Sequence, residues 1–180
     1  CLIEKRRLGG AGIYDGALSS KTLWELARDV RKLSFSDRGY HVHKYDISYK
    51  EIIDVTKAAV AERNQQMEDQ LEAYSCELCP DTVTLVRGFA RMMDCNTVHV
   101  KLIDGEEDYL SADNIVLATG SRPRTLPHIP VDEKTIVTSD GLSSFKQFPK
   151  SLVILGAGVI GCEFATIFNS FGQTQVSIID

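Results

Sequence analysis

The sequence feature that most constrains the fold is a glycine loop at residues 156–161, which lies between two apolar segments. The loop reads Gly-Ala-Gly-Val-Ile-Gly and follows the apolar run 151–155, which has the length and composition of a buried strand. A helical pattern follows the loop, and a further strand pattern, 176–179, ends at Asp180. Strands that alternate with a helix predict an α/β fold with parallel strand pairing.

Each glycine of this loop has its own role in binding a dinucleotide. Gly156 permits the tight turn, Gly158 lets the backbone approach a pyrophosphate, and Gly161 lets the helix pack closely on the strand. The start of the helix adds free N–H groups and the positive end of its dipole. Asp180 lies 19 positions after Gly161, where an acid binds a ribose 2′-hydroxyl and repels a 2′-phosphate, which favours NAD over NADP. The alternative interpretation of residues 156–161 is a tight glycine turn that only connects packed elements. The predicted cofactor contacts are Gly156, Gly158, Val159, Ile160, Gly161 and Asp180.

Composition excludes several classes of protein. The 180 residues carry a formal net charge of −5, which argues against a nucleic-acid or membrane-surface protein, because both need a basic face. The apolar stretch 151–168 contains three glycines and Glu163, so we reject it as a membrane span. Five cysteines are too few and too scattered for a disulfide scaffold and indicate a reducing compartment. We expect a cytoplasmic protein, with the mitochondrial matrix as the alternative.

The rest of the chain alternates between strand and helix patterns. Residues 1–4 read as a buried strand that ends in Glu4, the same pattern that the chain shows at Asp180. A helix is predicted from Ser19, with Ser19 and Ser20 as N-cap candidates, and a longer one after the capping box Ser48-Tyr-Lys-Glu51. Strands are predicted at 82–86, 97–103, 108–110 and, as a buried strand, 114–118, and a turn or short helix at 139–141.

Several short motifs together resemble one known family. They are Leu8-Gly-Gly10, Ser20-Lys-Thr-Leu23, Gly88-Phe-Ala90, Ala118-Thr-Gly-Ser-Arg-Pro123, Ser139-Asp-Gly141 and Gly156-Ala-Gly-Val-Ile-Gly-Cys-Glu163. In this order they resemble the pyridine nucleotide-disulfide oxidoreductases, a family of flavoproteins with two dinucleotide-binding domains, and the resemblance covers essentially the whole chain. Within the family, the stretches at 139–141 and 161–165 are most similar to the soluble pyridine nucleotide transhydrogenases.

The resemblance implies an FAD/NAD(P)-binding, Rossmann-like α/β fold with two nucleotide-binding domains, both incomplete in this chain. Residues 1–122 would be part of the FAD domain, whose glycine loop would lie upstream of Cys1. Residues 123–148 would be a connector, and 149–180 the first βαβ part of the NAD(P) domain. We therefore expect an internal piece of a longer chain that forms a homodimer and whose partners are small-molecule nucleotides.

The resemblance also assigns roles to single residues. Glu4 resembles the acid on the FAD adenosine ribose, Gly9 and Gly10 resemble the turn beside FAD, and Ala90 resembles the backbone contact to the adenine. Lys21 resembles the lysine that tunes the flavin ring, and Glu163 resembles the acid near the nicotinamide; both are predicted catalytic residues. The segment that closes over FAD at the domain crossover corresponds to Thr119, Gly120 and Ser121.

The chain departs from the family where a pair of redox cysteines would stand. Gly12 and Ala17 occupy those positions, and neither can form a thiolate or a disulfide. We therefore expect hydride exchange between nicotinamide nucleotides through FAD. The alternatives are a relative of lipoamide dehydrogenase that uses other thiols, such as Cys76 and Cys79, and an inactive nucleotide-binding protein.

The cysteines also show a spacing that is typical of a zinc site. Cys76-Glu-Leu-Cys79, followed by Cys95 and His99, gives this spacing. Because 97–103 reads as a strand without a loop to shape a site, we favour structural cysteines and predict no metal site.

Overall fold

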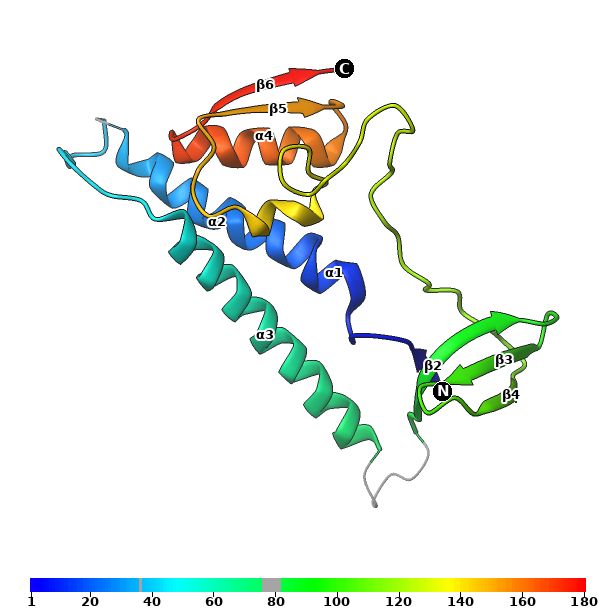
Figure 1. Cartoon of the computed structure of the whole chain (residues 1–180). Coiled ribbons are helices and arrows are strands. Elements are labelled where there is room, and N and C mark those ends of the chain that lie inside the picture. Colours follow the sequence, from blue (N-terminus) through cyan, green and yellow to red (C-terminus); the bar gives the residue numbers. More distant parts are fainter. Residues whose placement is uncertain (36, 76–81) are drawn as a thin grey trace. The chain divides into compact units, whose positions relative to one another are not determined.

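The computed structural model describes residues 1–35, 37–75 and 82–180, which form two compact units. The first unit comprises Cys1–Ala11 and Glu62–Ser121, and the second comprises Gly12–Ala61 and Arg122–Asp180. Two helices cross the boundary: α1 (Gly10–Tyr14) and α3 (Tyr49–Tyr74) (Figure 1). The mixed α/β class that the sequence predicts is confirmed.

The first unit is built on a four-stranded sheet in the order β1-β2-β3-β4 (Figure 1). Its strands are β1 (Leu2–Glu4), β2 (Leu85–Met92), β3 (Thr97–Leu102) and β4 (Glu107–Ser111). The pairing of β1 with β2 is parallel, and the other two pairings are antiparallel. Val98 and Val100 of β3 are buried and lie on the same face of the sheet.

Two strand predictions in the first unit need correction. β2 begins at Leu85 and continues to Met92, instead of spanning 82–86, because its extent follows its pairing with β1 and β3. Residues 114–118 do not form a buried strand: Val116 is 88% exposed and Leu117 is 69% exposed. An apolar run becomes a strand only where a neighbouring strand takes up its backbone hydrogen bonds, and no described strand does so here.

The second unit layers helices on a two-stranded parallel sheet. Strands β5 (Ser151–Leu155) and β6 (Gln175–Ile179) pair over their full length, and α4 (Val159–Phe171) connects them and packs on both. Helix α2 (Ala17–Leu33) lies along α4, and the short 3-10 helix η1 (Asp140–Ser144) confirms the turn predicted at 139–141 (Figure 1).

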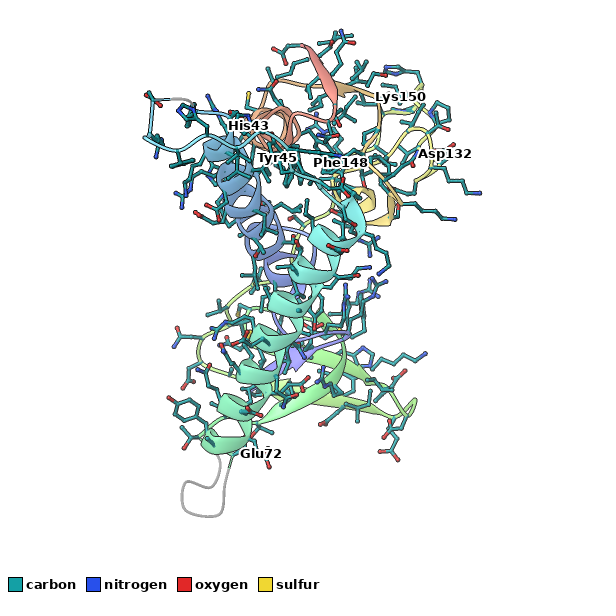
Figure 2. The ribbon with its side chains drawn as sticks, turned by 90° about the vertical axis from the view of Figure 1, so that its left-hand side faces the viewer. His43, Tyr45, Glu72, Asp132, Phe148 and Lys150 are labelled. Atoms are coloured by element: carbon teal, nitrogen blue, oxygen red, sulfur yellow. The ribbon has the colours of Figure 1, made fainter. Side chains whose placement is uncertain are left out.

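The core of the second unit joins residues from its two sequence stretches. Tyr49, at the start of α3, is 4% exposed and donates a hydrogen bond to the Leu142 carbonyl at 2.8 Å. Its ring meets the Phe148 ring edge-on at 4.8 Å between centroids. Figure 2 shows where Phe148 lies in this unit. Further buried members of this cluster are Leu23, Ala27, Ile53, Phe164, Ile167, Phe168 and Phe171. Aromatic packing of this kind adds stability beyond the area that it buries.

The first residues of α2 and α3 test the N-cap predictions made from the sequence. The prediction at Ser48 is confirmed, since its hydroxyl accepts the Glu51 N–H at 3.3 Å. The prediction at Ser19 and Ser20 is wrong, because α2 begins at Ala17 with Gly16 as the N-cap residue. Ser19 Oγ donates to the Gly16 carbonyl at 3.0 Å, so this hydroxyl bonds back to the preceding turn instead of capping the helix.

None of the helices in the described ranges is both long enough and apolar enough to cross a bilayer.

Candidate functional site

The glycine loop joins β5 to α4 with the backbone geometry that the sequence predicts. Gly156 has φ +103°, which other residues rarely adopt. At Gly161 a Cβ would lie 2.1 Å from the Gly156 carbonyl oxygen and 3.2 Å from Ile154 Cγ2, so only glycine permits this approach of helix and strand. At Gly158 an added Cβ would meet no atom within 4 Å, so the space beside this residue is open.

The first turn of α4 is available to an anion. Gly158 is the N-cap residue and offers no side-chain hydrogen bond to the helix. Val159 and Ile160 follow it and are 85% and 59% exposed. The first N–H groups of an α-helix have no partner within the helix and lie at the positive end of its dipole. Backbone donors, open space and a dipole therefore meet at one point, as phosphate binding requires.

Asp180 lies against the same loop. It follows β6, and its Oδ1 accepts the backbone N–H of Ala157 at 2.9 Å. The parallel pairing of β5 with β6 places the ends of both strands at one edge of the sheet, which explains why this carboxylate meets the loop. A carboxylate can accept further hydrogen bonds, so Asp180 keeps capacity for a ribose hydroxyl.

Lys21 and Glu163 form an ion pair between α2 and α4. Ser20 Oγ donates to the same Glu163 oxygen at 3.3 Å, and Ser20 is buried. The Glu163 side chain is 15% exposed and the Lys21 side chain is 66% exposed, so the acid is held in the packed layer while the ammonium reaches solvent. An ion pair that is exposed on one side adds little stability.

The residues predicted to contact FAD lie in the first unit. Glu4 ends β1, and its Oε1 accepts the Arg6 N–H at 2.7 Å. Gly9 and Gly10 have φ of 85° and 47° where α1 begins, so both positions favour glycine. Ala90 lies on β2 opposite Val100. The last predicted contacts are Thr119, Gly120 and Ser121, in a segment without helix or strand where Gly120 has φ 81°.

The positions of the expected redox cysteines hold no thiol. Gly12 lies within α1 and Ala17 is the first residue of α2. Among the described residues the free cysteines are Cys1, Cys95 and Cys162, all exposed, whereas Cys76 and Cys79 lie outside the described residues.

Cys95 and His99 are engaged by different neighbours. Cys95 Sγ lies 3.0 Å from the Asn96 side-chain oxygen, and His99 Nε2 lies 3.1 Å from Glu107 Oε2. Within the ranges that the structure describes, no three His, Cys, Asp or Glu side chains gather as a metal site would need.

Sequence reasoning missed two side chains of this site. Ser20 was assigned to a helix cap, but its hydroxyl holds Glu163. Cys162 Sγ donates to the Ala157 carbonyl at 3.2 Å, next to the glycine loop. The spacing along α2 could have indicated Ser20, because Ser20, Leu23 and Ala27 recur at helical spacing on the buried face.

The second unit thus has the features of a dinucleotide-binding α/β protein: parallel strands, a glycine loop, a free helix N-terminus and an acid after the second strand. The sequence profile of the family described as "Pyridine nucleotide-disulphide oxidoreductase" matches residues 1–180. The chain belongs to this family, whose enzymes use FAD and a nicotinamide nucleotide.

Individual relatives agree with this assignment. A dihydrolipoyl dehydrogenase of Chlamydia trachomatis is 32% identical over 182 residues, which cover 99% of this chain and 37% of that protein. A soluble pyridine nucleotide transhydrogenase of Vibrio atlanticus is 31% identical over 95% of this chain and 36% of its own length. The crystal structure of LpdA from Mycobacterium tuberculosis matches with a TM-score of 0.81 and 25% identity, over 98% of this chain and 37% of LpdA. The chain therefore spans little more than a third of the length of these relatives.

Proposed function

We propose that the protein is an FAD-dependent oxidoreductase that transfers hydride between nicotinamide nucleotides, as a soluble transhydrogenase does. One observation carries this proposal: the Lys21–Glu163 ion pair is formed, while Gly12 and Ala17 provide no thiol. The chain thus keeps charged residues suited to hydride chemistry and lacks the dithiol that disulfide reduction at this position needs.

The residues around the glycine loop fit a nicotinamide dinucleotide. The open space beside Gly158 admits a pyrophosphate, and the first N–H groups of α4 would donate to it. Asp180 would accept a hydrogen bond from a ribose hydroxyl and would repel a 2′-phosphate, so we propose that this site prefers NAD to NADP.

The residues proposed to hold FAD supply matching polar groups. Glu4 would bind the adenosine ribose, the turn at Gly9 and Gly10 would lie beside the cofactor, and the Ala90 backbone would contact the adenine. The segment Thr119, Gly120 and Ser121 would close over it. When bound, FAD would supply the chemistry of hydride transfer between the two nucleotides. The proposed domain limits stay at 1–122 for the FAD domain, 123–148 for the connector and 149–180 for the NAD(P) domain.

Lys21 would act electrostatically. Ser20 donates a hydrogen bond to the Glu163 carboxylate, and this carboxylate pairs with the Lys21 ammonium. A fixed positive charge stabilises negative charge that develops as a ring system is reduced, because it needs no reorganisation at that moment. Glu163 would also be the acid nearest to the nicotinamide.

A second candidate is a lipoamide dehydrogenase-like enzyme, and the 32% identity to the Chlamydia trachomatis dihydrolipoyl dehydrogenase favours it. Such an enzyme needs a reactive dithiol, which would have to come from elsewhere in the protein, for example from Cys76 and Cys79. A third candidate is a nucleotide-binding protein without activity. In each case we propose a homodimer that acts in the cytoplasm or the mitochondrial matrix.

The experiment compares hydride exchange in the full-length protein and in three variants. With FAD added, transfer from NADPH to an NAD analogue of distinct absorbance is measured before and after thiol alkylation. We expect Lys21→Met to lower kcat by about 10- to 100-fold with little change in KM, because a charge that acts on the transition state is lost. Glu163→Gln should also lower kcat, since the Lys21 ammonium loses its carboxylate partner.

Lys32→Met is the matched control, because Lys32 lies on the same helix and pairs with Asp29 at 2.6 Å on the exposed side. It should leave kcat unchanged. Activity that needs a dithiol substrate and disappears on alkylation would overturn the proposal in favour of the lipoamide enzyme. Flavin that binds but is reduced by neither nucleotide would favour the inactive protein.

A further inference from the structure

The second unit contains a hollow between α2 and α4 that the proposed function does not use. Its volume is about 80 Å³. Helix α2 contributes Trp24, Ala27, Arg28 and Arg31, and α4 contributes Thr166, Ile167 and Ser170.

The floor of the hollow is apolar. Ala27 and Ile167 are each 1% exposed, belong to the buried core cluster and line the hollow. The small side chain of Ala27 leaves room that a longer residue would fill, and Trp24 forms a wall of this space. A void of 80 Å³ is about half the size of a cavity that holds benzene, so it takes a short alkyl group and not a ring.

The rim of the hollow carries positive charge. Arg28 and Arg31 contribute guanidinium groups, and the lining includes no acidic side chain. The other cations of α2 each have an acidic partner: Lys21 pairs with Glu163, Arg28 with Glu25 and Lys32 with Asp29.

Arg31 differs from these cations because it makes no ion pair with any residue in the described part of the chain. The Ser170 hydroxyl likewise has no hydrogen-bond partner among the described residues. The guanidinium N–H groups of Arg31 and the hydroxyl of Ser170 can therefore donate hydrogen bonds to a bound acceptor.

We propose that this hollow binds a small organic carboxylate with a compact alkyl group of about three or four carbons. The carboxylate would accept paired hydrogen bonds from Arg31 and a further one from Ser170, since a guanidinium matches carboxylate geometry. The alkyl group would lie against the partly exposed Trp24, above the buried Ala27 and Ile167. The site is independent of the glycine loop and does not rest on the proposed oxidoreductase activity.

Trp24 makes the proposal directly testable, because it is the only tryptophan of the chain and lines the hollow. The full ¹⁵N-labelled chain gives one indole N–H signal, which Trp24→Phe identifies by its loss. Isobutyrate is titrated against this signal at constant ionic strength, and isobutyramide, which has the same shape without charge, is titrated in parallel. We expect a saturable shift with isobutyrate and none with isobutyramide.

Variants separate binding from a structural role. Arg31→Gln should weaken isobutyrate binding by about tenfold, through loss of a charge-assisted pair. Ser170→Ala should weaken it by less. Arg63→Gln, which removes an exposed arginine of α3, is the matched control and should bind as the parent does.

Arg31 also lies in the last turn of α2, where a cation favours the helix dipole. Arg31→Gln should therefore lower thermal stability slightly whether or not the hollow binds a carboxylate. The test of the proposal is the isobutyrate binding curve. A shift that does not saturate, equal binding of the amide, or unchanged affinity in Arg31→Gln would each overturn the proposal.

Discussion

Replacing Tyr49 by Phe tests how the core of the second unit is held together. The tyrosine is 4% exposed, and its hydroxyl donates to the Leu142 carbonyl at 2.8 Å. Phenylalanine keeps the ring, and so keeps the contacts with Phe148 and Phe168, but it removes this donor. The Leu142 carbonyl retains a weaker bond from the Phe145 N–H at 3.3 Å, so it is not left without a donor. We therefore expect Tyr49→Phe to lower the free energy of unfolding by about 1–2 kcal/mol near pH 7.

The difference should depend on pH, with a sign that follows from burial. Burial raises the pKa of Tyr49 well above the ordinary tyrosine value of 10.0. Above about pH 10 the unfolded chain loses this proton while the folded chain keeps it, so the unfolded state binds fewer protons. The parent protein then loses about 1.4 kcal/mol per pH unit through this residue, and the Phe variant does not. The gap of about 1–2 kcal/mol should therefore close between about pH 10.6 and pH 11.5 and then reverse.

Urea unfolding followed by circular dichroism, from about pH 7 to pH 11.5, measures this gap. Tyr40→Phe is the matched control, because the Tyr40 hydroxyl also donates to a backbone carbonyl, that of Lys32 at 3.2 Å, but the residue is 41% exposed. Its effect should stay within about 0.5 kcal/mol. A Tyr49→Phe variant as stable as the parent near pH 7, or a gap that stays constant above pH 10, would refute the reasoning.

Three further changes have defined outcomes. Gly161→Ala would place a Cβ 2.1 Å from the Gly156 carbonyl oxygen and should lower the free energy of unfolding by about 1–3 kcal/mol in urea titrations; an unchanged midpoint would contradict this packing. Gly158→Ala meets open space and should leave that midpoint unchanged while it weakens NAD binding by calorimetry; unaltered affinity would show that no phosphate approaches here. Burial, together with the Asp15 carboxylate, raises the pKa of Asp140. Ionisation of Asp140 above about pH 4 therefore costs stability. Asp140→Asn should accordingly be more stable than the parent near pH 7 and lose that advantage below about pH 3, as acid titrations monitored by circular dichroism would show.

Local patterns predicted the nucleotide loop well, because its requirements are local. An apolar strand, three glycines and a helix start lie within residues 151–161, and the positive φ of Gly156 and the tight contact at Gly161 explain why glycine is needed there. The burial expected for this strand is wrong, because Val153 is 57% exposed and Leu155 is 56% exposed. The acid after β6 could also be predicted, since parallel pairing brings both strand ends to one edge. The bond from the Glu51 N–H to the Ser48 hydroxyl could be predicted for the same reason.

Features that depend on distant partners were harder to predict. Residues 114–118 have a strand composition, but no described strand takes up their hydrogen bonds. The hydroxyls of Ser19 and Ser20 have equal capping potential by type, yet one bonds back to Gly16 and the other reaches Glu163. The Lys21–Glu163 pair joins positions 142 residues apart, which no local pattern reveals. The resemblance to a family gave each residue a catalytic role and did not predict their ion pair.

The second unit is assembled from two separate stretches of chain, and this order has a consequence during translation. Leu23 and Ala27 leave the ribosome long before Ile167 and Phe171, which cover them. At ordinary synthesis rates the delay is on the order of ten seconds. Throughout that interval the nascent chain presents an uncovered apolar helix face, so a holdase chaperone should bind it until α4 is made. Slowing the ribosome between residues 34 and 158 should increase aggregation without any change in the finished sequence.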